Sequence, residues 1–309
     1  MNAANPIGVF DSGVGGLSVL HEIRRALPRE NLLYVADSAH APYGDKSQQF
    51  IEARSIAISE FLVSRHAKAI VVACNTATGA AVTTLRSRFS MPIIAMEPAV
   101  KPAVANTQSG VIGVLATSRT LASDNFVRLF ARYSADVEIL GQACPGLVEQ
   151  VEAGELSGNK TRILLEQYVL PLLEQGADTI VLGCTHYPFL APLIQEITGS
   201  NVAVIDSAAA VARQLRRRLE VHNLLADKDA VDVGGTIPSM SAAERQLPGA
   251  AKIVVLGGAG VQADTKTGTE CFWTSGEPDK AKPLVSQLWK ADVEVCRLTS
   301  KLDRPTPRT

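Results

Sequence analysis

The sequence shows no long apolar run, no excess of either charge and no pattern typical of a secretory leader in its opening residues. No apolar run approaches the roughly 18 residues that a membrane-spanning helix requires, and the opening MNAANPIGVF shows no charged region followed by an apolar one. The 30 basic and 31 acidic residues leave a net charge of −1, whereas a nucleic-acid-binding protein normally shows a basic excess. We therefore expect a cytoplasmic protein with no membrane partner and no nucleic-acid partner.

The spacings of metal sites are also missing. The chain has five cysteines but no CxxC and no HxxxH pattern. An odd number of cysteines in a chain of 309 residues fits reduced thiols better than a disulfide framework. Cys184 and His186 form a Cys-x-His pair without the four-ligand spacing of a structural zinc site. We expect no metal, which leaves His186 as a surface side chain or as an acid that orients the second thiol.

Two similar segments each place a cysteine after an apolar run. AIVVACNTAT (69–78) and TIVLGCTHYP (179–188) both run from β-branched residues through a small residue to a cysteine. Continuous apolar runs of this length suit parallel strands covered on both faces, and open α/β sheets bind ligands beyond the carboxyl ends of their strands. We predict that Cys74 and Cys184 meet across one cleft.

Further pairs of segments repeat at nearly the same spacing. The sequence offset between the two cysteines is 110 (184 − 74), and the offset between IGVFDSG (7–13) and IGVLATS (112–118) is 105 (112 − 7). Glu97 and Asp206 follow similar apolar segments, and their offset is 109 (206 − 97). The sequence therefore predicts an α/β protein with two similar domains, each with a mostly parallel sheet flanked by helices. A pseudo-two-fold duplication would relate them and place the active site in the cleft between them.

Apolar periodicity and turn residues predict alternating strands and helices. The predicted strands are residues 7–10, 31–37, 69–73, 92–96, 111–117, 137–143, 179–183, 202–205, 252–260 and a strand within 272–278. The predicted helices include residues 17–27, 48–66, 78–89, 159–175 with a kink at Pro171, and 208–225. Ser47 and Ser207 are expected to cap their helices, another helix follows Ser123, and Pro145 is expected to begin a short helix that contains Glu152.

The position of the two cysteines favours the thiolate. A thiol beside the start of a helix lies near unpaired backbone N–H groups and the positive end of the helix dipole. An ordinary cysteine, with a pKa of about 8.5, is only a few per cent ionised at pH 7, so a lowered pKa would make a usable base. The alternative is that Cys74 and Cys184 are small buried apolar residues. Their duplicated position and polar neighbours favour the chemical role.

A glycine-rich turn after the first strand raises a dinucleotide site as a rival. Gly13, Gly15 and Gly16 precede a predicted helix, and Asp37 ends the next strand, where a ribose-binding acid would fall. The pattern lacks the third glycine of G-x-G-x-x-G, and Asp11 would repel a pyrophosphate. We therefore do not expect hydride-transfer chemistry with a nicotinamide.

Four motifs resemble a known family. FDSGVGGLSV (10–19), YVADSAHAPYGDKS (34–47), VVACNTAT (71–78) and VLGCTHYP (181–188) closely resemble the glutamate racemase family of the aspartate/glutamate racemase superfamily. The resemblance covers most of residues 6–225. It implies cofactor-independent interconversion of L- and D-glutamate, which supplies D-glutamate for peptidoglycan.

The resemblance also implies roles for individual residues. Cys74 would deprotonate D-glutamate and Cys184 L-glutamate, each acting as the acid in the opposite direction. Asp11 would assist the first thiol, His186 the second, and Glu152 would support His186. The implied substrate-binding residues are Asp11, Ser12, Tyr43, Gly44, Asn75, Thr76, Thr117, Thr120, Thr185 and His186.

The resemblance further implies a discontinuous first domain. Its parts are residues 1–97 plus 207–309, and residues 98–206 form the second domain. The segment 226–268 is longer than the family's usual connection. The expected partner is glutamate, with a homodimer and a regulatory cell-wall precursor as further candidates. The alternatives are a non-catalytic two-lobed amino-acid-binding protein and a racemase of a related acidic amino acid.

Overall fold

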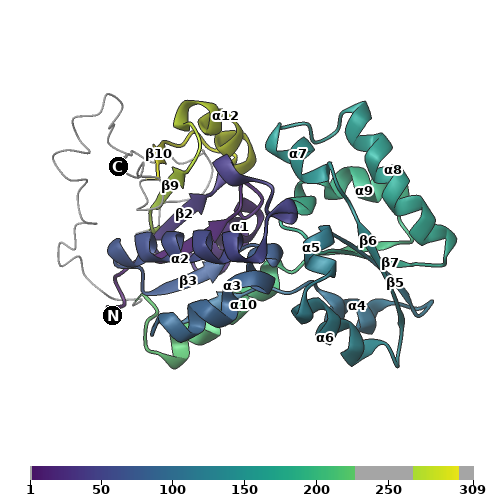
Figure 1. Cartoon of the computed structure of the whole chain (residues 1–309), viewed down its shortest axis with the longest axis horizontal. Coiled ribbons are helices and arrows are strands. Elements are labelled where there is room, and N and C mark those ends of the chain that lie inside the picture. The colour runs from purple at the N-terminus through teal and green to yellow at the C-terminus, as the bar shows by residue number, and fades with distance from the viewer. Residues whose placement is uncertain (1, 227–266, 299–309) are drawn as a thin grey trace, which may run out of the picture.

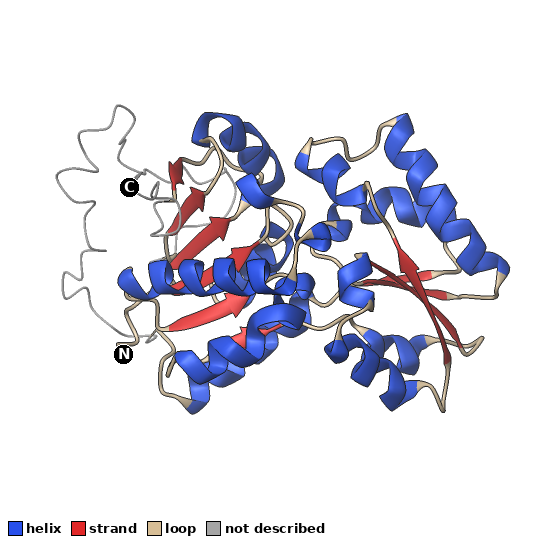
Figure 2. Ribbon diagram, viewed as in Figure 1, coloured by secondary structure: helices blue, strands red, loops and turns tan. Residues whose placement is uncertain are grey.

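The chain forms two separate parallel sheets with helices on both faces (Figures 1 and 2). A computed structural model describes residues 2–226 and 267–298. The strand expected at 252–260, and nearly all of the long segment 226–268, lie outside the described residues. Among the described helices, none combines the length and apolar composition needed to cross a lipid bilayer.

Every strand pair in both sheets is parallel. The first sheet has the order β10-β9-β2-β1-β3-β4, with β1 Ile7–Asp11, β2 Leu32–Ala36, β3 Ala69–Val72, β4 Ile93–Ala95, β9 Glu270–Thr274 and β10 Val295–Arg297. The second has the order β6-β5-β7-β8, with β5 Val111–Ala116, β6 Glu138–Ala143, β7 Thr179–Leu182 and β8 Ala203–Ile205. These strands confirm the predicted fold class.

The helices bury their apolar sides against the two sheets. The α-helices are α1 Leu17–Ala26, α2 Gln48–Ser64, α3 Asn75–Arg88, α4 Val100–Asn106, α5 Ser118–Leu121, α6 Asp124–Tyr133, α7 Leu147–Glu152, α8 Asn159–Glu174, α9 Ala191–Thr198, α10 Ala208–Val221 and α12 Pro278–Trp289. Short 3₁₀ turns are η1 Ser38–His40, η2 Tyr43–Asp45 and η3 Tyr187–Leu190. Helices α1, α10 and α12 pack on one face of the first sheet, and α2 and α3 pack on the other. In the second sheet, α4 and α6 cover one face, and α7, α8 and α9 lie on the other.

The duplication predicted from the sequence is visible in strand order and register. The order β2-β1-β3-β4 in the first sheet matches β6-β5-β7-β8 in the second. Ile7 pairs with the first residues of β2 and β3, as Ile112 pairs with Ile139 and Thr179 of β6 and β7. The sheets therefore bring equivalent strand ends, and the residues after them, to equivalent places.

Equivalent glycines show that the duplication extends to side-chain packing. A Cβ atom on Gly8 of β1 would lie 2.9 Å from Leu62 Cδ1 of α2, and one on Gly113 of β5 would lie 2.8 Å from Leu172 Cδ1 of α8. The sequence offset between the two leucines is 110 (172 − 62), equal to that between the two cysteines. Both helices therefore approach their sheets where the strand has no side chain.

The C-terminal segment returns to the first sheet. Strand β9, which confirms the strand expected within 272–278, pairs with β2, and β10 pairs with β9. This pairing supports the predicted division into residues 1–97 plus 207–309 and residues 98–206, whose boundaries stay a prediction.

Two helices, α3 and α7, begin at residues other than those predicted. Ser47 and Ser123 do cap α2 and α6, accepting hydrogen bonds from Phe50 N and Phe126 N. The helix expected at 78–89 begins at Asn75, so Cys74 is its N-cap residue. Pro145 does not begin α7, because left-handed Gly146 (φ 88°) turns the chain before Leu147.

Helix α10 begins at residue 208 as predicted, but its cap and its end differ from the prediction. The Ser207 hydroxyl does not cap α10, because the Asp206 carboxylate accepts the hydrogen bond from Ala208 N instead, at 2.7 Å. The helix ends at Val221 rather than 225. Pro171 lies inside α8, which continues to Glu174, and α4 and α5 were not predicted.

We expect Gly113→Ala to destabilise the protein. The added methyl group would lie 2.8 Å from both Ile180 Cδ1 and Leu172 Cδ1, and such overpacking typically lowers the free energy of unfolding by about 1–3 kcal/mol. Urea denaturation would measure the loss. Gly276→Ala is the control, because its added methyl would meet ordinary contacts from 3.4 Å; equal losses in both variants would contradict this account.

Candidate active site

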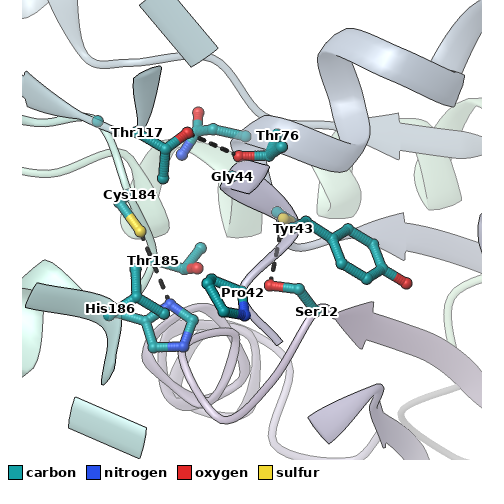
Figure 3. Close-up of a pocket in the computed structure, with 13 residues that line it drawn as sticks. Ser12, Pro42, Tyr43, Gly44, Thr76, Thr117, Cys184, Thr185 and His186 are labelled. Carbon is teal, nitrogen blue, oxygen red and sulfur yellow. Dashed lines mark hydrogen bonds between the residues drawn. The ribbon is translucent and has the colours of Figure 1, made fainter. Parts of the chain in front are cut away.

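Residues from both sheets line one cavity, shown in Figure 3. The lining comes from the segments that follow β1, β3, β5 and β7, from the loop around η2 and from α7. The residues are Ser12, Pro42, Tyr43, Gly44, Cys74, Asn75, Thr76, Thr117, Val148, Gly183, Cys184, Thr185 and His186. Both cysteines face this cavity, as the sequence predicted. Pro42, Val148 and Gly183 were not predicted as lining residues.

Cys74 is buried, and its surroundings favour the thiol over the thiolate. Its sulfur accepts a hydrogen bond from Ala77 N at 3.4 Å, and the thiol points to Ser12 Oγ at 3.8 Å. Burial, and next the negative charge of Asp11, raise the pKa of Cys74 well above its usual value. The lowered pKa expected from the helix start is therefore wrong for this residue. One backbone N–H at the start of α3 does not offset the loss of water around the sulfur.

Asp11 is fully buried beneath the first thiol. Its carboxylate accepts hydrogen bonds from Ser12 N at 2.7 Å, Gly16 N at 2.6 Å and Thr185 Oγ1 at 3.2 Å. Burial raises the pKa of Asp11, and the charge of His186 partly opposes that rise. The Thr185 contact joins this carboxylate to the second half of the chain.

His186 links a carboxylate to the second thiol. The ring is 1% exposed, so its placement on the surface is excluded. Its Nε2 lies 2.7 Å from Glu152 Oε1, and its Nδ1 lies 3.7 Å from Cys184 Sγ. Burial alone would disfavour the imidazolium, but hydrogen bonds with Cys184 and Glu152 raise the pKa of His186 well above its usual value. The imidazolium can therefore stabilise a thiolate at Cys184.

The glycines after β1 admit groups from the second half of the chain. A Cβ atom on Gly13 would lie 1.9 Å from Glu152 Oε1, and one on Gly15 would lie 2.3 Å from His186 Nδ1. The Gly16 N–H, which a pyrophosphate would need, already binds Asp11. The glycine-rich turn therefore fits the Glu152–His186 pair rather than a dinucleotide.

Asp37, the ribose-binding candidate of the rival interpretation, instead supports a loop at the cavity. Arg54 donates to its carboxylate from Nε at 2.9 Å and from Nη2 at 2.7 Å, and the Tyr43 hydroxyl donates at 2.6 Å. Burial alone would raise the pKa of Asp37, but the hydrogen bonds and charge of Arg54 hold it below its usual value. Tyr43 and Gly44 are thus fixed beside the cavity, and Arg54 was missed from the sequence because it carries no motif.

Three threonines join the halves at another side of the cavity. Thr76 Oγ1 lies 3.0 Å from Thr117 Oγ1 and 3.1 Å from Thr120 Oγ1. Thr76 and Thr117 line the cavity, whereas Thr120 lies behind them. The Asn75 side chain is 6% exposed, and within the described part of the chain neither its oxygen nor its nitrogen has a partner. A buried amide of this kind is suited to a polar ligand.

Comparison with known proteins shows to which family the chain belongs. The model of the Asp/Glu/hydantoin racemase family matches residues 7–215. The chain belongs to the Asp/Glu/hydantoin racemase family. A curated glutamate racemase of Methylococcus capsulatus is 59% identical over 285 residues, covering 92% of each chain. One from Pseudomonas aeruginosa strain PAO1 is 48% identical, covering 94% of this chain and 97% of its own.

Solved structures of this family share the whole fold. A glutamate racemase isoform of Bacillus anthracis superposes with a TM-score of 0.78 at 29% identity, covering 96% of this chain and 98% of that one. The Escherichia coli glutamate racemase, solved with L-glutamate and the activator UDP-MurNAc-Ala, has a TM-score of 0.73 at 29% identity. The superposed region covers 96% of this chain and 99% of the Escherichia coli chain.

We expect Gly13→Ala to keep the two halves from closing. Its methyl group would overlap the Glu152 carboxylate, and a displacement of about 1 Å can cost on the order of 10²-fold in rate. Small-angle X-ray scattering should show a larger radius of gyration, and racemase activity should fall by about that factor. Gly276→Ala should leave both unchanged, and normal activity in Gly13→Ala would refute the steric account.

We expect Asp37→Asn to destabilise the protein at neutral pH but not in acid. The folded pKa of Asp37 lies below its unfolded value of about 3.9, so its contribution to stability is present above that value and is lost as the pH falls through the folded pKa. Breaking a buried pair costs about 3 kcal/mol. Urea midpoints at pH 7 and at a pH below the folded pKa of Asp37 would test this.

The matched control for that variant is Glu277→Gln. Glu277 pairs with Arg297 at 2.6 Å, but the pair is exposed. Its loss should shift the urea midpoint little. The difference in urea midpoint between Asp37→Asn and the unaltered protein should shrink in acid. A difference that stays constant down to the lowest pH would contradict the lowered pKa of Asp37.

Proposed function

We propose that this chain interconverts L- and D-glutamate through two cysteines, without a cofactor. The observation that carries the proposal is that Cys74 and Cys184, at equivalent ends of duplicated strands, line the same cavity. Inverting a stereocentre by moving a proton requires a base on one face of the carbon and an acid on the other. Two equivalent strand ends supply these groups from opposite sides.

The proposed reaction moves one proton onto the substrate for each one removed. The Cys74 thiolate takes the α-proton of D-glutamate, and the Cys184 thiol gives its proton to the opposite face, which leaves L-glutamate and a Cys184 thiolate. In the reverse direction the roles exchange. The His186 imidazolium stabilises the thiolate of Cys184, and Asp11, whose pKa is raised by burial, accepts the proton that Cys74 releases on ionising. Positioned acids and bases of this kind are typically worth 10² to 10⁴ each.

The cavity offers neutral donors to the two carboxylates of glutamate. The unpartnered Asn75 amide and the threonine hydroxyls of residues 76, 117 and 185 surround it. Such donors also stabilise the negative charge that develops when the α-proton leaves. Thr120 and Glu152 lie behind the cavity lining, where Thr120 hydrogen-bonds with Thr76 and Thr117, and Glu152 with His186.

We also propose a cytoplasmic location, a role in supplying D-glutamate for peptidoglycan, and regulation by a cell-wall precursor. A groove of about 880 Å³ between α3, β4, α6 and α10 supports the last of these. It contains five cationic side chains and one acidic side chain, namely Arg86, Lys101, Arg128, Arg132 and Arg218, with Glu97. A phosphate-bearing precursor would suit this charge. Added UDP-MurNAc-Ala should raise the activity if the proposal holds, and the homodimer stays a prediction.

Incubation with L-glutamate in deuterated water, without added cofactor, tests the main proposal. We expect D-glutamate to form with deuterium at the α-carbon, and a parallel reaction with aspartate to be much slower. Binding without exchange would instead support an amino-acid-binding protein. A faster reaction with aspartate would support a racemase of a related acidic amino acid.

We expect Cys74→Ser and Cys184→Ser each to abolish racemisation while the fold stays intact. A serine hydroxyl is far less acidic than a thiol, so neither variant has both a base and an acid on opposite faces. Circular dichroism would check folding. Cys144→Ser is the control, because burial raises the pKa of that thiol to about 12 and it lies outside the cavity lining. Near-normal turnover in either active-site variant would refute the two-thiol mechanism.

A further inference from the structure

Tyr34 is a buried side chain that the proposed reaction does not use. It lies on β2 in the first half of the chain and is 1% exposed, with its ring packed near Phe272. Its hydroxyl donates a 2.7 Å hydrogen bond to Gly13 O, in the loop between β1 and α1. The phenol thus extends from the sheet to the glycine loop, residues 12–16, without lining the cavity.

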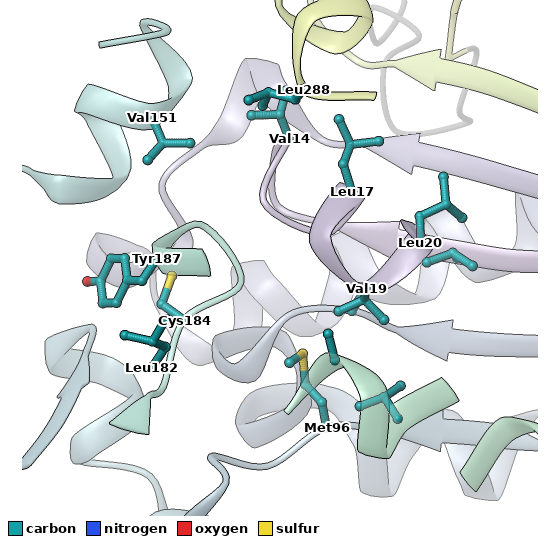
Figure 4. Packing of buried hydrophobic residues seen from close by; sticks show 14 of the residues in the cluster. Val14, Leu17, Val19, Leu20, Met96, Val151, Leu182, Cys184, Tyr187 and Leu288 are labelled. Atoms are coloured by element: carbon teal, nitrogen blue, oxygen red, sulfur yellow. The ribbon is translucent and has the colours of Figure 1, made fainter. Parts of the chain in front are cut away.

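The bond to Gly13 fixes one end of a peptide unit whose other end contacts the second half of the chain. Gly13 C=O and Val14 N–H belong to the same planar peptide group. Val14 N donates a 2.7 Å hydrogen bond to Glu152 Oε1 of α7. Tyr34 and Glu152 therefore bind opposite ends of one rigid unit. Figure 4 shows Val14 in this loop, with Val151 of α7 on the opposite side.

The chain of contacts continues to the second thiol. Glu152 Oε1 also binds His186 Nε2 at 2.7 Å, and His186 Nδ1 lies 3.7 Å from Cys184 Sγ. One carboxylate oxygen thus accepts hydrogen bonds from both halves of the chain. The direction of the Val14 N–H affects where this oxygen lies, and the oxygen orients the imidazole.

We propose that Tyr34 is a positioning residue for proton transfer at Cys184, acting through the Gly13–Val14 peptide unit, Glu152 and His186. The inference rests on the proposed two-thiol racemisation. The contacts of Tyr34 favour an effect on the second thiol. Asp11, beside the first thiol, accepts its hydrogen bonds from Ser12 N, Gly16 N and Thr185 Oγ1, and none of these donors belongs to the Gly13–Val14 peptide unit.

A purely structural role would be that Tyr34 only satisfies a buried carbonyl. Tyr168 provides the matched comparison, because its hydroxyl donates a 2.8 Å hydrogen bond to Pro145 O and its ring is also buried. That bond lies away from the glycine loop. Tyr34→Phe and Tyr168→Phe remove the same kind of hydrogen bond, so both should lower the melting temperature, but only Tyr34→Phe should alter the second proton transfer.

Isotope effects separate the two proton transfers. Because enantiomers have equal energy, kcat/KM must stay equal in both directions in any variant, so rates alone cannot show which transfer is slowed. We expect Tyr34→Phe to lower kcat/KM roughly 10-fold. The isotope effect on L-glutamate deuterated at the α-carbon should rise, because Cys184 removes that deuteron. The effect on deuterated D-glutamate should fall toward unity.

Two outcomes would overturn the proposal. One is a lower rate in Tyr34→Phe with both isotope effects unchanged; the other is the same change in Tyr168→Phe. If the unaltered protein does not racemise glutamate at all, the proposed function fails instead, so the two failures are distinguishable.

A double-mutant cycle gives an independent check. If Tyr34 acts through Glu152, the combined variant Tyr34→Phe, Glu152→Gln should lose less activity than the product of the two single losses, because residues in one network are not additive. Losses that multiply would show that Tyr34 acts by another route, and the proposal would be wrong. Steady-state kinetics of the four proteins at one pH supply the data.

Discussion

The close approach of the glycine loop to Glu152 and His186 is the contact on which the active site depends. Gly13 and Gly15 leave room for a carboxylate and an imidazole that arise from the other half of the chain. The approach buries four ionisable groups, Asp11, Cys74, Cys184 and His186. Burying charges is costly unless each is paired and hydrogen-bonded. Here the backbone N–H groups of Ser12, Val14 and Gly16 provide much of that compensation.

Burial makes the Cys74 thiolate a stronger base, but it also lowers the fraction of Cys74 that is ionised. The α-proton of an amino acid is a very weak acid, so a thiolate of raised pKa has more driving force to remove it, while a smaller fraction of the sulfur is ionised. Cys74 therefore does not need the lowered pKa that its place at a helix start suggested. What it needs is an acceptor for its proton, and the buried Asp11, itself with a raised pKa, lies beside it.

Local patterns in the sequence were sufficient for the strands, the parallel sheets, the duplication and the common cavity of Cys74 and Cys184. Apolar runs and repeated motifs report directly on buried strands. Features set by distant residues could not be read this way: the need for glycine at position 13 depends on Glu152, which belongs to the other half of the chain. Similarly, Asp37 resembled a ribose ligand because nothing in the sequence indicates that Arg54 folds back onto it. The capping side chain of α10 was predicted wrongly because Asp206 and Ser207 are neighbours that can both accept from the helix start.

Each half of the chain supplies one thiol, but the side chains beside the two thiols differ. This difference has a chemical consequence. In the duplicated segments, Asp11 of the first half corresponds to Ala116 of the second at an offset of 105 (116 − 11). Thr76 corresponds to His186, because each follows its cysteine by two residues. One thiol thus has a carboxylate beside it and the other has an imidazolium. If a carboxylate lay beside each cysteine, both cysteines would favour the thiol form. If an imidazolium lay beside each, both would favour the thiolate form. Racemisation requires one of each at every moment, and the asymmetric pair of partners stabilises that state: a thiol at one face and a thiolate at the other.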